Sequence, residues 1–145
     1  MIIGYTTGVF DLFHIGHLNI IKKAKENCDY LIVGVTTDEE VKRLKNMKPL
    51  IPFKERIEIV RALKFVDIAV AENNSDKIIA WKQHKYNRVF KGSDWKGTPK
   101  WEEYEKFFKT VNVEVMYFPY TEGTSSTKLR DYINGKNLLK NRDSK

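Results

Sequence analysis

Short apolar runs alternate with amphipathic segments along most of the 145-residue chain. The apolar runs are rich in β-branched residues and are bounded by glycine or polar residues, which is typical of strands. In the segments between them, apolar residues recur every three or four positions, as on one face of a helix. The runs predicted to be strands are 2–7, 29–37, 66–71, 88–92 and 113–118. The segments predicted to be helices are 15–26, 53–63, 75–86, 99–110 and 125–133.

This alternation predicts a Rossmann-like α/β domain with a mainly parallel five-stranded sheet and helices on both faces. We expect the domain to cover residues 1–134, where Asn134-Gly135 gives a stop signal, followed by a basic tail at 135–145. Ligands of such sheets bind beyond the carboxyl ends of the strands. The segments predicted to lie there are 8–17, 91–95 and 120–127.

Composition narrows the class of protein. No apolar run approaches the roughly 20 residues that span a bilayer, so we expect no membrane insertion. The N-terminal segment lacks the pattern of a signal peptide, and the single Cys28, interpreted as a passive residue, excludes an internal disulfide. Both features favour a cytoplasmic address. The net charge of +7 suits phosphorylated ligands, but the basic residues are dispersed, so no nucleic-acid partner is expected.

The segment GVFDLFHIGH places His14 and His17 three residues apart at the start of the first predicted helix. Both imidazoles should lie on one face, near free backbone N–H groups that favour an anion. Gly16 between them lets a ligand approach the backbone closely. Two alternatives are a simple helix cap and a metal site, although zinc requires more ligands than this segment offers. We expect no dedicated metal site, and His84 is interpreted as structural.

A second candidate site lies in YTEGTSSTK, between the last predicted strand and the last predicted helix. Ser125, Ser126 and Thr127 offer hydroxyl and N–H groups at a helix N-terminus, which favours an anion. A serine and threonine cluster here is often only a cap. The predicted topology, however, brings this cluster to the same edge of the sheet as the two histidines.

Together, GVFDLFHIGH and TEGTSSTK resemble the HxGH cytidylyltransferases, especially the bacterial glycerol-3-phosphate cytidylyltransferases. The resemblance covers about residues 2–133 and includes the segments DYLIVGVTTDEE, ERIEIVRALKFVD and KGSDW. It implies that CTP and a small alcohol phosphate, with sn-glycerol 3-phosphate as the best guess, react to give a CDP-alcohol and pyrophosphate. It also implies that Mg²⁺ accompanies the CTP phosphates and that the chain forms a homodimer.

The resemblance also implies roles for individual residues. The catalytic residues would be His14, His17 and Lys48, with the histidines on the α- and β-phosphates. The nucleotide would be bound by Val9, Phe10, Ile15, Gly16, Asp94, Tyr120, Thr121, Glu122, Gly123, Thr124, Ser125, Ser126 and Thr127. The substrate would be bound by Asp11, Asp38, Lys45, Arg56, Lys64 and Lys77.

Several of these assignments leave alternatives open. The spacing of the lysines after the second predicted strand differs from that of the family by about one residue, so either Lys45 or Lys48 would contact CTP. Asp11 and Asp38 are equally compatible with capping or turn roles. Lys77, in a first helical turn where its charge opposes the helix dipole, suits either a phosphate or an exposed position.

One departure from the family concerns the base. The family motif usually begins with arginine, where this chain has Tyr120, whose ring can stack on a base. In addition, SSTKLR resembles phosphopantetheine adenylyltransferases, and VKRLK with KGSD resembles heptose-phosphate adenylyltransferases. The TEG segment favours the cytidylyl branch. The alternatives are an adenylyltransferase of the same fold and a non-catalytic nucleotide- or RNA-binding protein.

Overall fold

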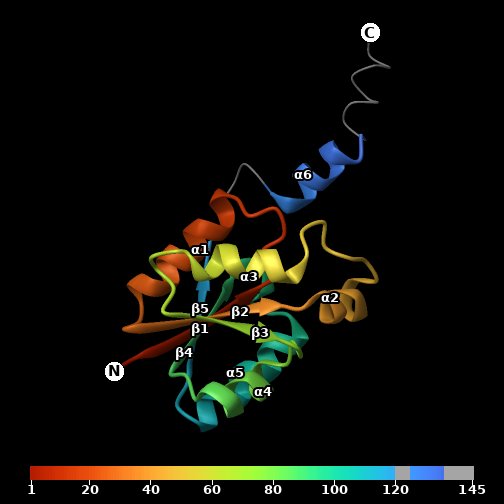
Figure 1. The fold of residues 1–145 in the computed structure, drawn as a ribbon. Helices are drawn as coiled ribbons and strands as arrows, with labels where there is room; N and C mark the ends of the chain where they lie inside the picture. Colours follow the sequence, from red (N-terminus) through yellow and green to blue (C-terminus); the bar gives the residue numbers. More distant parts are fainter. Residues whose placement is uncertain (120–124, 136–145) are drawn as a thin grey trace.

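The computed structural model describes residues 1–119 and 125–135. Its centre is a five-stranded sheet in the order β3-β2-β1-β4-β5, and every neighbouring pair is parallel (Figure 1). The strands are β1 (Ile3–Gly8), β2 (Tyr30–Thr36), β3 (Ile68–Glu72), β4 (Arg88–Gly92) and β5 (Glu114–Phe118). The helices are α1 (Ile15–Glu26), α2 (Asp38–Lys45), α3 (Phe53–Arg61), α4 (Lys77–His84), α5 (Pro99–Thr110) and α6 (Ser126–Ile133), with a 3₁₀ turn η1 (Ser93–Trp95).

Helices cover both faces of the sheet, which confirms the predicted Rossmann-like α/β class (Figure 1). On one face, α1 and α3 pack on the strands through a core that includes Ile21, Ile57 and Val60. On the other face, α4 and α5 form a more aromatic core around Trp101 and Phe108. In the described part of the chain, no helix combines the length and the apolar character needed to cross a bilayer.

Most element boundaries agree with the sequence predictions to within one or two residues. The prediction missed α2, whose buried residues are limited to Glu40 and Val41, so no apolar stripe reveals it. Other local interactions stabilise this helix. The Thr37 side chain caps the first turn, acidic residues occupy that turn, and basic residues occupy the last one, as the helix dipole favours.

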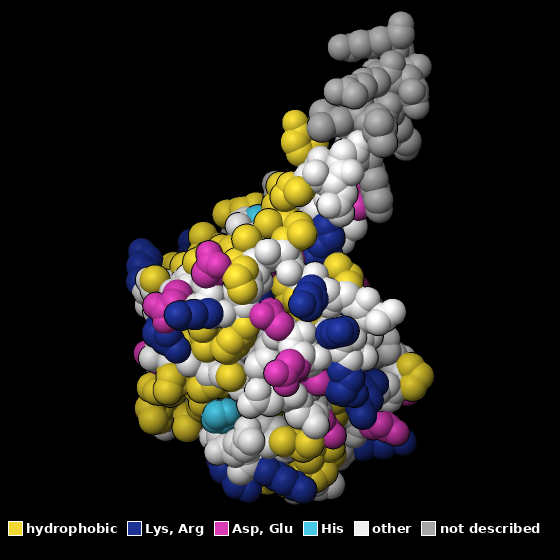
Figure 2. Space-filling model, turned by 45° about the vertical axis from the view of Figure 1, so that its right-hand side comes forward, with side chains coloured by type: hydrophobic (Ala, Val, Ile, Leu, Met, Phe, Trp, Pro, Cys, Tyr) yellow, Lys and Arg dark blue, Asp and Glu magenta, His cyan; other side chains and the backbone are white. Residues whose placement is uncertain are grey.

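The order of the strands decides where a ligand can bind. From β1 the chain passes through α1 to β2 on one side, whereas β4 pairs with the other side of β1. The loops after β1 and β4 therefore diverge at the carboxyl edge, at the switch point where such sheets bind ligands. At this edge α6 extends away from the two layers and has no buried residue (Figure 1 and Figure 2).

Candidate active site

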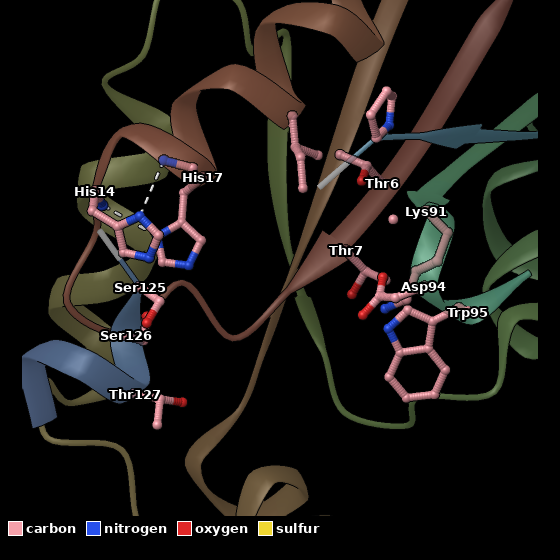
Figure 3. A pocket seen from close by; sticks show the side chains of 14 residues that line it. Thr6, Thr7, His14, His17, Lys91, Asp94, Trp95, Ser125, Ser126 and Thr127 are labelled. Carbon is pink, nitrogen blue, oxygen red and sulfur yellow. Dashed lines mark hydrogen bonds between the residues drawn. The ribbon is translucent and has the colours of Figure 1, made fainter. Parts of the chain in front are cut away.

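Three adjoining cavities open at the carboxyl edge of the sheet. The first, here called the histidine cavity, has a volume of about 280 Å³ and lies between α1 and α6 on one side and the end of β4 on the other (Figure 3). The loop cavity, about 250 Å³, lies against residues 8–11 and the loop that follows α2. The lysine cavity, about 470 Å³, lies between β1, β3, α4 and α5 and is lined by Lys45, Lys77, Lys91 and Lys100. Described residues of all three predicted segments line the histidine cavity.

His14 and His17 build the start of α1 together. His14 is the N-cap residue, and its Nδ1 accepts a hydrogen bond from the Gly16 backbone N–H at 3.0 Å. His17 Nδ1 accepts from the backbone N–H of His14 at 3.2 Å, which completes a reciprocal capping box (Figure 3). The ring centroids are 4.0 Å apart. The capping interpretation is therefore correct, but the same rings also line the cavity.

These two hydrogen bonds fix the tautomer of both rings. A backbone N–H can donate only to an unprotonated ring nitrogen, so each imidazole must carry its proton on Nε2. Burial lowers the pKa of His14. Burial lowers the pKa of His17 to about 4, with a further lowering from His14 and an opposing effect of Asp11. At neutral pH both residues therefore offer neutral Nε2–H donors to the cavity rather than positive charges.

Asp11 connects the loop after β1 to its surroundings. Its carboxylate accepts hydrogen bonds from the backbone N–H groups of Leu50 and Ile51, both at 2.9 Å, and from Arg130 Nη2 at 2.6 Å. Burial alone would raise the pKa of Asp11, but these bonds outweigh it and lower the pKa. The neighbours Phe10 and Leu12 have left-handed backbone conformations, with φ of 56° and 51°. Asp11 thus holds a strained loop in place, as the alternative turn role predicted.

The start of α6 forms the second half of the wall beside the histidines. Ser125 caps this helix, because its hydroxyl accepts from Lys128 N at 3.1 Å. Ser126 Oγ donates to the Asp11 carbonyl at 2.6 Å, and Thr127 is exposed. The N-terminal turns of α1 and α6 therefore border the same cavity, which makes it a candidate anion site.

Two of the predicted substrate residues form the framework beneath the site. Arg56 is 1% exposed, and its guanidinium donates to the carbonyls of Val9, Thr36 and Ile51 and to Asp38 Oδ1. The Asp38 carboxylate also accepts from the Phe53 backbone N–H and thereby caps α3. For Asp38, this contact agrees with the alternative interpretation of the residue as a helix cap. Arg56, predicted to bind substrate, instead has its donors engaged inside the protein.

The four predicted lysines occupy different environments. Lys45 lines both the loop cavity and the lysine cavity, whereas the exposed Lys48 lines none of the three. Lys64 is exposed at the end of α3, with its ammonium 5.2 Å from the centre of the Phe65 ring, and is not brought to the site.

Lys77 is buried, so the exposed alternative for this residue was wrong. Its Nζ donates to the Ser75 carbonyl at 2.7 Å and lies 3.4 Å from both carboxylate oxygens of Glu72. Burial lowers its pKa, and Glu72 opposes this shift. Sequence patterns did not identify Glu72, which also accepts a hydrogen bond from Tyr5 at 2.7 Å and lines the lysine cavity.

The predicted nucleotide residues are brought together in part. Gly16 and Asp94 line the histidine cavity, Val9 lines the other two cavities, and the buried Phe10 ring lies 5.4 Å from the His17 ring. Ile15 is 51% exposed and lines none of the three cavities. Some predicted residues lie outside the described part of the chain, namely Tyr120, Thr121, Glu122, Gly123 and Thr124, as does the tail after Gly135.

Cys28 and His84, interpreted from the sequence as passive and structural residues, both contact neighbouring groups of the fold. Cys28 Sγ donates to the Ala24 carbonyl at 3.3 Å, and burial raises the pKa of this thiol, which disfavours a reactive thiolate. The His84 ring stacks on Tyr5 with a centroid distance of 5.8 Å, and burial lowers its pKa.

The fold and the paired helix starts form a candidate site for a phosphorylated ligand, and comparison with known proteins gives the family. The sequence model described as cytidylyltransferase-like matches residues 5–132, so the chain belongs to the cytidylyltransferase-like family. It is 34% identical over 138 residues to the glycerol-3-phosphate cytidylyltransferase of Bacillus subtilis (strain 168), covering 90% of this chain and 95% of the relative.

Other relatives carry different names. The chain is 35% identical over 129 residues to the FAD synthase of Thermococcus sibiricus, covering 88% of this chain and 87% of that protein. Among solved structures, the lipopolysaccharide core biosynthesis protein of Thermoplasma volcanium superposes with a TM-score of 0.70 at 26% identity, over 86% of this chain and 99% of that one. The fold is thus shared by relatives whose names point to different substrates.

Proposed function

We propose that this nucleotidyltransferase transfers the CMP group of CTP to a small alcohol phosphate, with sn-glycerol 3-phosphate as the first acceptor to test. The observation that carries this proposal is the reciprocal cap of His14 and His17, which leaves two Nε2–H donors at a cavity bordered by two helix N-termini. The similarity to the glycerol-3-phosphate cytidylyltransferase of Bacillus subtilis supports the choice of donor and acceptor.

The transfer itself requires positioning and charge stabilisation. An acceptor phosphate oxygen attacks the α-phosphorus of CTP, and the bond to the bridging oxygen breaks, so that pyrophosphate leaves with the electron pair. The Nε2–H groups of His14 and His17 would donate to the phosphate oxygens on which negative charge grows. Because their Nδ1 atoms are already held by the backbone, little reorganisation is needed when the charge develops.

The lysine cavity suits the acceptor. Lys45 and Lys77 line it and would attract the phosphate of the alcohol. Lys77 is held from behind by Glu72 and the Ser75 carbonyl, so its ammonium is positioned before a ligand binds. The aromatic rings of Trp101 and Tyr104 complete this cavity and would restrict the shape of the alcohol.

Mg²⁺ fits this site as a companion of the nucleotide. In the described part of the chain no three His, Cys, Asp or Glu side chains gather as metal ligands. Asp94 is an exposed carboxylate at the histidine cavity, where it would contact a metal or a ribose hydroxyl. When bound, the ion would shield the negative charge of the phosphates.

Transfer of AMP from ATP is the second candidate function, and the similarity to the FAD synthase of Thermococcus sibiricus supports it. Pyrophosphate release should be measured with CTP and with ATP, each in the presence of glycerol 3-phosphate, ribitol 5-phosphate or phosphoethanolamine. We expect CTP with glycerol 3-phosphate to react fastest. Faster turnover with ATP would reassign the donor, and no release with any pair would overturn the proposed function.

A further inference from the structure

The histidine cavity and the lysine cavity share a wall formed by Thr7, Lys91 and Trp95. Thr7 and Lys91 each precede the last residue of their strand, and these strands, β1 and β4, are neighbours in the sheet. Figure 3 shows both side chains at the end of the histidine cavity opposite His14 and His17. When two phosphates in neighbouring cavities react, the reacting atoms meet at the wall that the cavities share.

Lys91 lacks the partner that a partly buried ammonium normally has. In the described ranges no carboxylate or carbonyl accepts a hydrogen bond from its Nζ, which instead lies 4.8 Å from the Trp95 ring centre and 5.9 Å from that of Trp101. Burial lowers the pKa of Lys91 to about 8. Lys77 and Lys45 lower this pKa further, and Glu72 and Asp94 raise it. An anion at the shared wall would relieve this unfavourable environment.

The hydroxyl of Thr7 also needs a hydrogen-bond partner. Its Oγ1 is buried and has no hydrogen-bond partner of normal geometry within the described structure, because the Tyr5 hydroxyl, which interacts weakly with Thr7, donates to Glu72. Thr7 lines all three cavities. Because a buried hydroxyl without a partner destabilises a protein, such a group at a cavity wall indicates an oxygen atom supplied by a ligand.

We propose that Lys91 and Thr7 bind the acceptor phosphate where it meets the nucleotide, and that Lys91 is a catalytic residue of the transfer. This inference rests on the function proposed above. As the acceptor oxygen bonds to the α-phosphorus and the bond to the departing pyrophosphate breaks, the Lys91 ammonium keeps its proton. It offsets the repulsion between the two phosphates while Thr7 Oγ1 donates a hydrogen bond to the acceptor.

The main test compares Lys91→Met with Lys96→Met. Lys96 follows the same turn, is exposed and lines none of the three cavities, so it controls for the loss of one charge. Lys91→Met should lower kcat/KM for the acceptor about a hundredfold or more, by analogy with a lost donor to a developing oxyanion. Its melting temperature should change little, because no hydrogen bond or ion pair is removed and loss of the ring contacts is offset by relief of a buried charge. A kcat/KM within twofold of Lys96→Met would overturn the proposal.

The pH dependence gives an independent readout. In the wild type, kcat/KM for the acceptor should fall as the pH rises above about 8, because Lys91 loses its proton. Lys91→Arg retains the charge and should move this fall to higher pH. The charged groups that face Lys91 from neighbouring elements are Lys45, Glu72, Lys77, Asp94 and Lys100. An unchanged fall in Lys91→Arg would assign the titration to one of these groups and overturn the role of Lys91.

Thr7→Val tests the hydroxyl. Valine has nearly the same shape, so this variant should melt at a higher temperature than the wild type while kcat/KM for the acceptor falls about tenfold. A lower melting temperature, or unchanged kcat/KM, would overturn the role of Thr7.

Failure of the proposed function can be recognised separately. If the wild type released no pyrophosphate with any nucleotide and alcohol phosphate, the shared wall would be tested by calorimetric titration with inorganic phosphate. Weaker phosphate binding by Lys91→Met than by Lys96→Met would support the anion site although the transfer reaction was wrong. Equal binding would overturn the site as well.

Discussion

The two walls of the histidine cavity are built in opposite ways. On the α1 wall, both histidines use Nδ1 to complete the helix start and keep Nε2 for a ligand. On the opposite wall, at the ends of β1 and β4, Lys91 and the Thr7 hydroxyl have no hydrogen-bond partner of normal geometry in the part of the chain that the structure describes. The first wall is therefore fixed before a ligand arrives, whereas the polar groups of the second are completed by the ligand. Removing a side chain from the first wall should therefore lower both stability and activity, whereas removing one from the second should lower activity alone.

The largest effect is expected at the α1 wall, from variants that keep the cap. Asparagine is a favourable N-cap residue and glutamine is favourable at the third helical position, so His14→Asn and His17→Gln can preserve the backbone bonds. Each variant replaces the rigid Nε2–H donor of the ring by a flexible amide NH2 in a different position, and should lower kcat about a hundredfold or more. Melting temperature and steady-state kinetics should be measured on the same samples.

Alanine at these positions gives the matched comparison. His14→Ala and His17→Ala lose both the donor and the cap, so they should also lose about 1 kcal/mol of stability. If the alanine variants kept near-normal kcat, the α1 wall would be structural only, and the proposed mechanism would be wrong.

An intermediate effect is expected for the lysines near α2. Lys45→Met should raise the KM for CTP or the acceptor about tenfold, because Lys45 lines two of the cavities and a lost charged contact costs roughly 1.5 kcal/mol. Lys48→Met should have a smaller effect, since Lys48 lines none of them. Lys42→Met, on the exposed side of the same helix, is the control for net charge. A larger effect at Lys48 would support its predicted catalytic role.

The last effect concerns stability against pH rather than activity. The pKa of His17 is about 4 in the folded protein and about 6.5 in the unfolded chain, where the ring is solvated. Between these values the unfolded chain binds a proton that the folded protein does not, so stability is complete above pH 6.5 and falls as the pH is lowered toward 4. His17 should contribute at most about 3 kcal/mol to this fall by pH 4.

Denaturant unfolding of the wild type and His17→Gln, followed from pH 7 to pH 4, isolates this contribution. The difference in stability between the two proteins should shift in favour of His17→Gln as the pH falls. A constant difference would mean that His17 titrates normally in the folded protein.

The sequence predicted the sheet because strand and helix periodicity are local properties. It also predicted that residues 8–17, 91–95 and 120–127 approach one another, because parallel strands place their carboxyl ends at one edge, and the described residues of all three segments line one cavity. It missed α2, which is stabilised by its cap and its charges rather than by an apolar stripe. The site roles that came from the resemblance to the family stay predictions where the cavities do not test them.

Burial was the property that the sequence could not supply. Arg56 and Lys77 look alike as basic residues near helix starts, yet Arg56 is enclosed by carbonyls and Lys77 faces a cavity. Thr7 and Lys91 carried no motif of their own. Their significance comes from two cavities meeting between neighbouring strands, which is a property of the assembled fold.

Arg56 has a consequence for how the protein loses its structure. Its guanidinium joins the loop after β1, the end of β2 and the segment before α3, through Val9, Thr36 and Ile51. These bonds form only when all three elements have docked, so the loops that carry the α1 wall open together with the sheet in one cooperative unit. The helix α6 has no buried residue, and Ser126 and Arg130 tie it to Asp11, so it can detach by local unfolding. Amide hydrogens beyond the first turn of α6, which are hydrogen-bonded within the helix, should therefore exchange long before their counterparts in α1, and activity should be lost while the sheet is still intact.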